Sequence, residues 1–174
     1  DANENAFGSP AGRGLNRYPD PLQRKVKRLI ASMNGVSPSQ IFVGNGSDEA
    51  IDLLFRVFCK PGRDEVIICP PTYGMYRVSA DINDIAVREI PLTSDFQLDV
   101  PSVSSAISDA VKLIFTCSPN NPTGNLMRRE SIVEICKKFD GVVVLDEAYI
   151  HFAEEPSMIG DLPGLPNLVV LQTF

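Results

Sequence analysis

Two polar side chains that could do chemistry follow an apolar run near the end of the chain: Asp146 and, three residues later, Tyr149. The run, residues 142–145, is three valines and a leucine, which is typical of a strand buried on both faces of a parallel sheet. Ligands of open α/β sheets bind beyond the carboxyl ends of the strands, where both side chains would project. A buried carboxylate needs a partner, and no Lys or Arg lies nearby in sequence. Asp146 therefore either caps the turn after its strand or pairs with the cationic ring nitrogen of a cofactor.

A second group of candidates lies in the turn of residues 44–48, which precedes an apolar helical pattern. Gly46, Ser47 and Asp48 would stand at the helix start, where free backbone N–H groups and the helix dipole favour a phosphate. The same residues also fit ordinary helix capping, because a serine cap with acidic residues in the first turn is common. This turn alone does not decide between a phosphate site and a cap.

Two further turns offer groups for recognising a flat ligand. Tyr73 follows two prolines at the end of an expected strand, so its ring either lies against a ligand or serves only in packing. Asn121 lies in the segment 118–124, a turn stiffened by proline that ends in glycine. That segment either presents amide donors in a fixed direction or is only a tight connection.

The elements that must position these residues alternate along the chain. Strands are expected at residues 40–43, 65–69, 86–90, 112–117, 142–145 and 168–172. Helices are expected from Pro21 to a stop at Gly35, and then at 47–58, 73–81, 101–109 and 129–139. Strands that alternate with helices indicate parallel βαβ units, so the expected fold is α/β with a mostly parallel sheet covered by helices on both faces. Residues 1–16 have no periodicity and read as an extended arm.

The composition bounds the class of protein. The 174 residues are 44% hydrophobic and 22% charged, as in a soluble globular protein, and no apolar run approaches the roughly 20 residues that cross a bilayer. No basic and then apolar leader is present, and the net charge of −6 disfavours nucleic acid. The four cysteines lack the spacing of metal ligands, so reduced core thiols in a cytosolic protein are expected at Cys59, Cys69, Cys117 and Cys136.

In combination, these motifs resemble a known family. The sequence Asn-Pro-Thr-Gly at 121–124, followed by Asp-Glu-Ala-Tyr at 146–149, resembles the fold-type-I aminotransferases that use pyridoxal 5′-phosphate. The resemblance is closer to the histidinol-phosphate aminotransferases and covers nearly the whole chain. Segments similar to that family's, in its order, are also found at 1–5, 16–21, 43–49, 70–76 and 168–174.

The resemblance implies roles for the residues that hold the ring of the cofactor. Asp146 would pair with the pyridine nitrogen and keep it protonated, with a lowered carboxylate pKa beside that cation. Asn121 and Tyr149 would hydrogen-bond the ring oxygen, and Tyr73 would stack on the ring. The resemblance also implies a cis peptide bond between Asn121 and Pro122.

Other residues would hold the phosphate of the cofactor. The family pattern assigns this role to Gly46, Ser47 and Asp48, with help from Thr173. Tyr18 would reach the phosphate from a neighbouring copy of the chain, which implies a homodimer with shared sites.

The implied activity is transfer of an amino group between L-glutamate and imidazole acetol phosphate, giving L-histidinol phosphate in cytoplasmic histidine biosynthesis. The catalytic lysine would follow shortly after Phe174, so residues 17–174 would be part of the large domain of a longer enzyme and inactive alone. Ala6 stands where many members of that family have proline. This departure bears on the substrate contacts of the arm and leaves the expected fold unchanged. Three alternatives remain: another fold-type-I enzyme, either an aromatic aminotransferase or a phosphate-recognising decarboxylase; a nucleotide-binding α/β module using residues 44–47; and a fragment that only binds or dimerises. The second lacks the usual glycine-rich patterns and leaves Asp146 unexplained.

Overall fold

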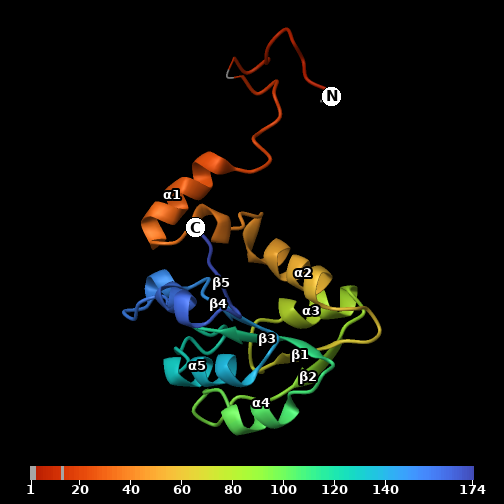
Figure 1. Ribbon diagram of the computed structural model, residues 1–174, viewed down its shortest axis with the longest axis vertical. Helices are drawn as coiled ribbons and strands as arrows, with labels where there is room; N and C mark the ends of the chain where they lie inside the picture. Colours follow the sequence, from red (N-terminus) through yellow and green to blue (C-terminus); the bar gives the residue numbers. More distant parts are fainter. Residues whose placement is uncertain (1–2, 13) are drawn as a thin grey trace. The chain divides into compact units, whose positions relative to one another are not determined.

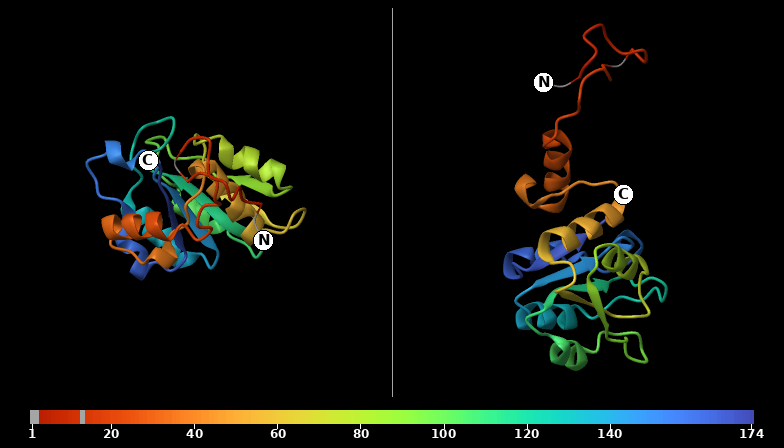
Figure 2. Two further views of the ribbon diagram at one scale, coloured as in Figure 1. Left: turned by 90° about the horizontal axis from the view of Figure 1, so that it is seen from above. Right: turned by 90° about the vertical axis from the view of Figure 1, so that its right-hand side faces the viewer.

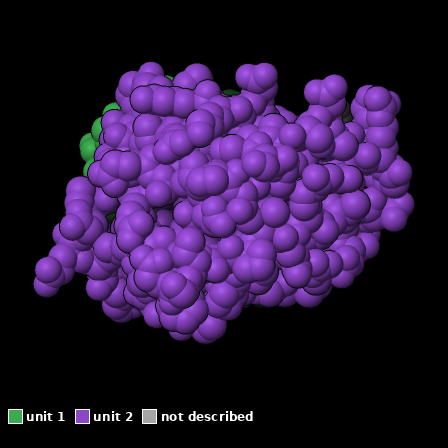
Figure 3. Space-filling model, turned by 90° about the horizontal axis from the view of Figure 1, so that it is seen from below, with its two compact units in different colours: residues 1–43 green, residues 44–174 purple. Residues whose placement is uncertain are grey.

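The computed structural model describes residues 3–12 and 14–174, so Asp1, Ala2 and Arg13 of the expected arm lie outside the described residues. The chain divides into two compact units, residues 1–43 and 44–174 (Figure 3). The expected division into an arm of residues 1–16 and a partial domain from residue 17 stays a prediction.

The first unit contains one α-helix, α1 (Arg24–Asn34), and a 3₁₀ turn, η1 (Pro38–Gln40). The prediction that the helix begins at Pro21 is wrong by three residues. The Asp20 carboxylate accepts hydrogen bonds from the backbone N–H groups of Leu22 and Arg24, at 3.1 Å each, and this forms a separate turn ahead of the helix. Gly35 ends α1 in the left-handed region (φ 67°), as the sequence predicts.

The strand predicted at residues 40–43 is also wrong. Ser37 and Gln40 form a capping box, in which each side chain accepts a hydrogen bond from the local backbone, and Pro38 begins the 3₁₀ turn. Ile41, just after the turn, has an extended backbone (φ −111°, ψ 125°), but none of the five strands of the sheet pairs with residues 40–43, so the run does not become a strand.

The second unit is an α/β fold with one five-stranded sheet, and it confirms the predicted class. Its strands are β1 (Glu65–Ile68), β2 (Ala86–Glu89), β3 (Val111–Cys117), β4 (Val142–Asp146) and β5 (Leu168–Leu171). They are arranged in the order β2-β1-β3-β4-β5, and every neighbouring pair is parallel. Helices α2 (Gly46–Phe58) and α3 (Met75–Ile82) cover one face of the sheet, and α4 (Val100–Ala106) and α5 (Arg129–Lys138) cover the other (Figures 1 and 2).

Each face of the sheet packs on its own core, because the central strands are apolar on both sides. On the α2/α3 face, Phe55 lies against Phe115 of β3 with ring centroids 5.3 Å apart. On the opposite face, Ile132 and Ile135 of α5 pack with Val143 of β4. All five side chains are fully buried, as uninterrupted apolar strands predict.

Because the strands are parallel, their carboxyl ends lie at one edge of the sheet. The segments that follow β1, β3, β4 and β5, four consecutive neighbours, therefore come together there.

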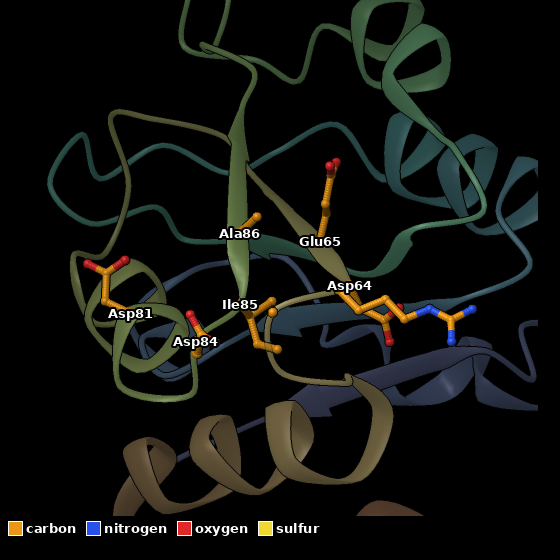
Figure 4. Close-up of a pocket in the computed structure, with 8 residues that line it drawn as sticks. Asp64, Glu65, Asp81, Asp84, Ile85 and Ala86 are labelled. Atoms are coloured by element: carbon orange, nitrogen blue, oxygen red, sulfur yellow. The ribbon is translucent and has the colours of Figure 1, made fainter.

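At the opposite edge, where β1 and β2 begin, a pocket is lined by residues 62–65, 81 and 84–86 (Figure 4). Two of its acidic groups are engaged within the protein: Asp64 accepts from the Lys60 backbone N–H at 2.8 Å, and Glu65 pairs with Arg88. None of the helices in the described part of the chain has the length and apolarity that crossing a bilayer requires.

Candidate active site

Asp146, the last residue of β4, lies at the carboxyl edge between the ends of β3 and β5 and is only 2% exposed. Its Oδ2 accepts a hydrogen bond from the Tyr76 phenol at 2.8 Å, and its Oδ1 accepts one from the Ala148 backbone N–H at 3.0 Å. No ion pair among the described residues includes Asp146. Burial raises the pKa of this carboxyl above its ordinary value, although the two hydrogen bonds act in the opposite direction. In the protein alone the shift is thus opposite to the lowering expected beside a pyridinium.

Tyr76 is the partner of Asp146 that sequence reasoning missed. A Lys or Arg near in sequence would be the ordinary partner of a carboxylate, whereas the donor is a phenol 70 residues earlier in the chain. Its ring is fully buried on α3, stacks on Phe115 at 4.9 Å and meets Tyr73 edge-on at 5.6 Å. The sequence does offer one signal for Tyr76: it follows Tyr73 by three residues, a spacing that places both side chains on one side of a helical turn.

Tyr73 joins the carboxyl edge to the start of α2. Its hydroxyl donates to Oδ1 of Asp48 at 3.2 Å, and burial raises the pKa of the phenol, with the Asp48 charge acting in the same direction. Gly46 begins α2 with φ 79°, a conformation that favours glycine. The N–H groups of Gly46, Ser47 and Asp48 lie in the first turn, where an α-helix offers them no internal acceptor. The predicted phosphate turn is therefore next to the predicted stacking ring.

The loop after β3 is held by Asn120, which the sequence did not distinguish from its neighbour Asn121. The Asn120 side chain is buried; its Nδ2 donates to the Pro71 carbonyl at 2.9 Å and to Thr123 Oγ1 at 2.6 Å. Asn121 is partly exposed, and its side chain forms no hydrogen bond within residues 3–12 and 14–174. The Asn121–Pro122 bond is cis, as the resemblance implied. Asn120 thus fixes the loop, while the side-chain amide of Asn121 has no partner within the described residues.

The remaining candidates differ in how closely they join this edge. Tyr149 follows Asp146 by three residues and is 46% exposed. The Thr173 hydroxyl donates to the Ala148 carbonyl at 3.2 Å, which places it beside the end of β4. Tyr18 is 64% exposed and belongs to the unit of residues 1–43, so its role stays a prediction. The four cysteines are buried free thiols, as predicted for core positions.

Comparisons with known proteins show similar sequences and similar folds. A histidinol-phosphate aminotransferase of Cytophaga hutchinsonii is 54% identical over all 174 residues, and the match covers 50% of that protein. The crystal structure of the histidinol-phosphate aminotransferase of Sinorhizobium meliloti in complex with pyridoxal 5′-phosphate superposes with a TM-score of 0.83 at 25% identity, covering 99% of this chain and 50% of that one. An L-threonine-O-3-phosphate decarboxylase of Porphyromonas gingivalis gives a TM-score of 0.75 at 26% identity, covering 91% and 48%.

The chain spans about half the length of the curated relatives it matches. A sequence model of the family described as aminotransferase class I and II matches residues 2–174. The crystal structure of the histidinol-phosphate aminotransferase of Clostridium acetobutylicum gives a TM-score of 0.79 at 25% identity, covering 91% of this chain and 47% of that one. The chain belongs to the aminotransferase class I and II family.

Proposed function

We propose that these residues form the coenzyme-binding part of a transaminase that uses pyridoxal 5′-phosphate. The observation that carries the proposal is the buried carboxylate of Asp146, which has two hydrogen-bond donors and no cation near it in the described residues. A buried carboxylate with a raised pKa gains most from a ligand that brings a positive charge, and a pyridinium nitrogen is such a group.

The other side chains of the carboxyl edge fit the rest of that coenzyme. We propose that Tyr73 lies against the ring and that Asn121 and Tyr149 hydrogen-bond the ring oxygen. Asp146, Tyr149 and Asn121 would be the catalytic residues of this chain, because they touch the reacting part of the coenzyme. When bound, the coenzyme would supply an electron sink for the bonds broken at the substrate's α-carbon.

The phosphate of the coenzyme would bind at the start of α2. Free N–H groups of Gly46, Ser47 and Asp48, the Ser47 hydroxyl and the helix dipole favour an anion there. Thr173 would contribute its hydroxyl, and Tyr18 of a second copy would reach the same phosphate. The Tyr18 contact implies that the whole protein is a homodimer with shared sites. Its proposed location is the cytoplasm, because its relatives are named as enzymes of histidinol-phosphate metabolism.

The proposed reaction moves an amino group between L-glutamate and imidazole acetol phosphate to give L-histidinol phosphate. Support comes from the names of relatives that are 47–54% identical over all 174 residues. The chain covers only about half of each relative, so the lysine and the groups that choose the substrate are proposed to lie in the rest of the whole protein.

The test uses the full-length protein. It should bind pyridoxal 5′-phosphate and transaminate imidazole acetol phosphate with glutamate far faster than it transaminates aromatic keto acids. Preference for aromatic keto acids, or release of carbon dioxide from a phosphorylated amino acid, would assign it to another reaction of the same fold. The likeness to the L-threonine-O-3-phosphate decarboxylase makes the second of these the alternative to measure. Binding of ATP or NAD in place of pyridoxal 5′-phosphate would indicate a nucleotide-binding module instead.

A further inference from the structure

The Tyr76 hydroxyl is held in place by packing as well as by its own hydrogen bond. The ring is fully buried, with Phe115 stacked on it at 4.9 Å and Tyr73 against it edge-on at 5.6 Å. Phe115 is itself stacked on Phe55 of α2, so the ring is part of a continuous aromatic row. The hydroxyl then lies 2.8 Å from Oδ2 of Asp146. Removing the oxygen alone would leave the row of rings intact.

The groups around Asp146 otherwise oppose its charge. Asp48 on α2 and the adjacent Glu147 both raise the pKa of the carboxyl, after the larger effect of burial. Cys117 of β3 pairs in register with Asp146 and contacts the same phenol, and its own thiol pKa is raised to about 11, so it remains neutral. The phenols of Tyr73 and Tyr149 complete the surroundings and carry no positive charge. Among the residues that the structure describes, Tyr76 and the Ala148 N–H are the donors that stabilise the ionised carboxylate.

We infer that Tyr76 is a positioning residue that keeps Asp146 ionised and fixes the orientation of its carboxylate toward the coenzyme. This inference rests on the proposed function, since it assigns Tyr76 to the site where the coenzyme would bind. Tyr76 acts through Asp146 and need not touch the coenzyme. The physical reason is that a hydrogen bond to an ionised group is stronger than one between neutral groups, so the phenol favours the charged form.

The test is Tyr76→Phe in the full-length protein, with Asp146→Asn and the double variant beside it. Apparent affinity for pyridoxal 5′-phosphate is measured by fluorescence titration across pH. Tyr76→Phe should weaken binding about tenfold at neutral pH, the loss expected for one hydrogen bond to a charged group. On acidification, the variant should also begin to lose affinity at a higher pH than the wild type does, because its Asp146 becomes protonated at a higher pH. In the Asp146→Asn background, Tyr76→Phe should have no further effect on the pH profile.

Two results would overturn the inference: an unchanged pH profile in Tyr76→Phe, or an equal loss of affinity at every pH that persists in the Asp146→Asn background. The second pattern would mean that the hydroxyl serves only packing.

If the wild-type protein binds no pyridoxal 5′-phosphate at any pH, the proposed function fails. The inference about Tyr76 is then decided by the unfolding free energy of the free protein. Relative to wild type, Tyr76→Phe should lose more stability as the pH rises through the titration of Asp146, and a loss independent of pH would contradict it.

Discussion

Gln172, just after β5, donates from its side-chain amide to Oε2 of Glu147, just after β4, over 2.9 Å. Glu147 is 2% exposed and also accepts from the Ser157 hydroxyl at 2.5 Å and from the Met158 backbone N–H at 2.8 Å. One buried carboxylate thus joins the ends of two strands to the segment that connects them. Thr173 of the candidate site follows Gln172 directly. The cluster of Glu147, Ser157, Met158 and Gln172 therefore holds the backbone that leads to Thr173.

Glu147→Ala should therefore destabilise the full-length protein by about 3 kcal/mol or more, because one buried donor (the Met158 N–H) and two partly buried donors (Ser157 and Gln172) lose a charged acceptor. Glu147→Gln should lose less, since its carbonyl can still accept from Met158. Glu134→Ala is the matched control: its partner Lys138 is an exposed i,i+4 neighbour, and such pairs contribute about 0.5 kcal/mol or less. Denaturant unfolding measures all three. A Glu147→Ala loss no larger than that of Glu134→Ala would contradict the structural role of the cluster.

Asp146→Asn should have opposite effects with and without coenzyme. In the free protein the folded pKa of Asp146 is raised above its unfolded value, so its contribution to stability is present below the unfolded pKa and is lost as pH rises through the folded pKa. Asn cannot ionise, and the free variant should therefore be more stable than wild type at pH 7, with the difference vanishing toward pH 4. With pyridoxal 5′-phosphate the order should reverse. Thermal unfolding of the free and the coenzyme-bound proteins, wild type and variant, checks this order. Full coenzyme affinity in the variant would contradict the role proposed for Asp146.

The alternation of strands and helices in residues 44–174 follows from the sequence, because apolar runs such as 142–145 and stripes such as that of residues 129–139 differ in period. Parallel pairing then places the strand ends together, which is why the sequence alone predicts that Asp146, Asn121 and Tyr73 lie at one edge. What the sequence could not supply is which side chain meets which. Tyr76 and Asp146 are hydrogen-bonded only because the packing of α3 against the sheet brings them together. Asn120 and Asn121 are the same residue type, and only the course of the loop decides which side chain is buried.

The cysteine thiols should resist alkylation while the protein is folded. Burial raises the pKa of Cys69 to about 12 and those of Cys59, Cys117 and Cys136 to about 11. At pH 8 a thiol with a pKa of about 11 is ionised in about one molecule in a thousand, and the thiolate is the reactive form. Iodoacetamide followed by mass spectrometry should label these four positions in urea and leave them unmodified in the native protein. Rapid native labelling of Cys117 would mean that the β3 end opens to solvent.

Asn120→Ala should impair coenzyme binding although Asn120 is not proposed to touch the coenzyme. Its side chain ties the loop 118–124 to the Pro71 carbonyl, and Thr72 donates to its Oδ1 at 3.2 Å, so the loop and the Tyr73 turn hold each other. Loss of this buried amide should cost about 1–3 kcal/mol of stability and free both Asn121 and Tyr73 to move.

Asn167 provides the matched control at the amino edge of the sheet, where its amide donates to the carbonyls of Cys136, Phe139 and Gly141 at 2.8–3.1 Å. Asn167→Ala should destabilise the full-length protein by a similar amount, because it also leaves backbone carbonyl groups without their donor. Its affinity for pyridoxal 5′-phosphate should stay at the wild-type value, whereas Asn120→Ala should weaken binding several-fold. Equal affinities in the two variants would show that the loop after β3 orders itself without Asn120, because a general loss of stability is common to both.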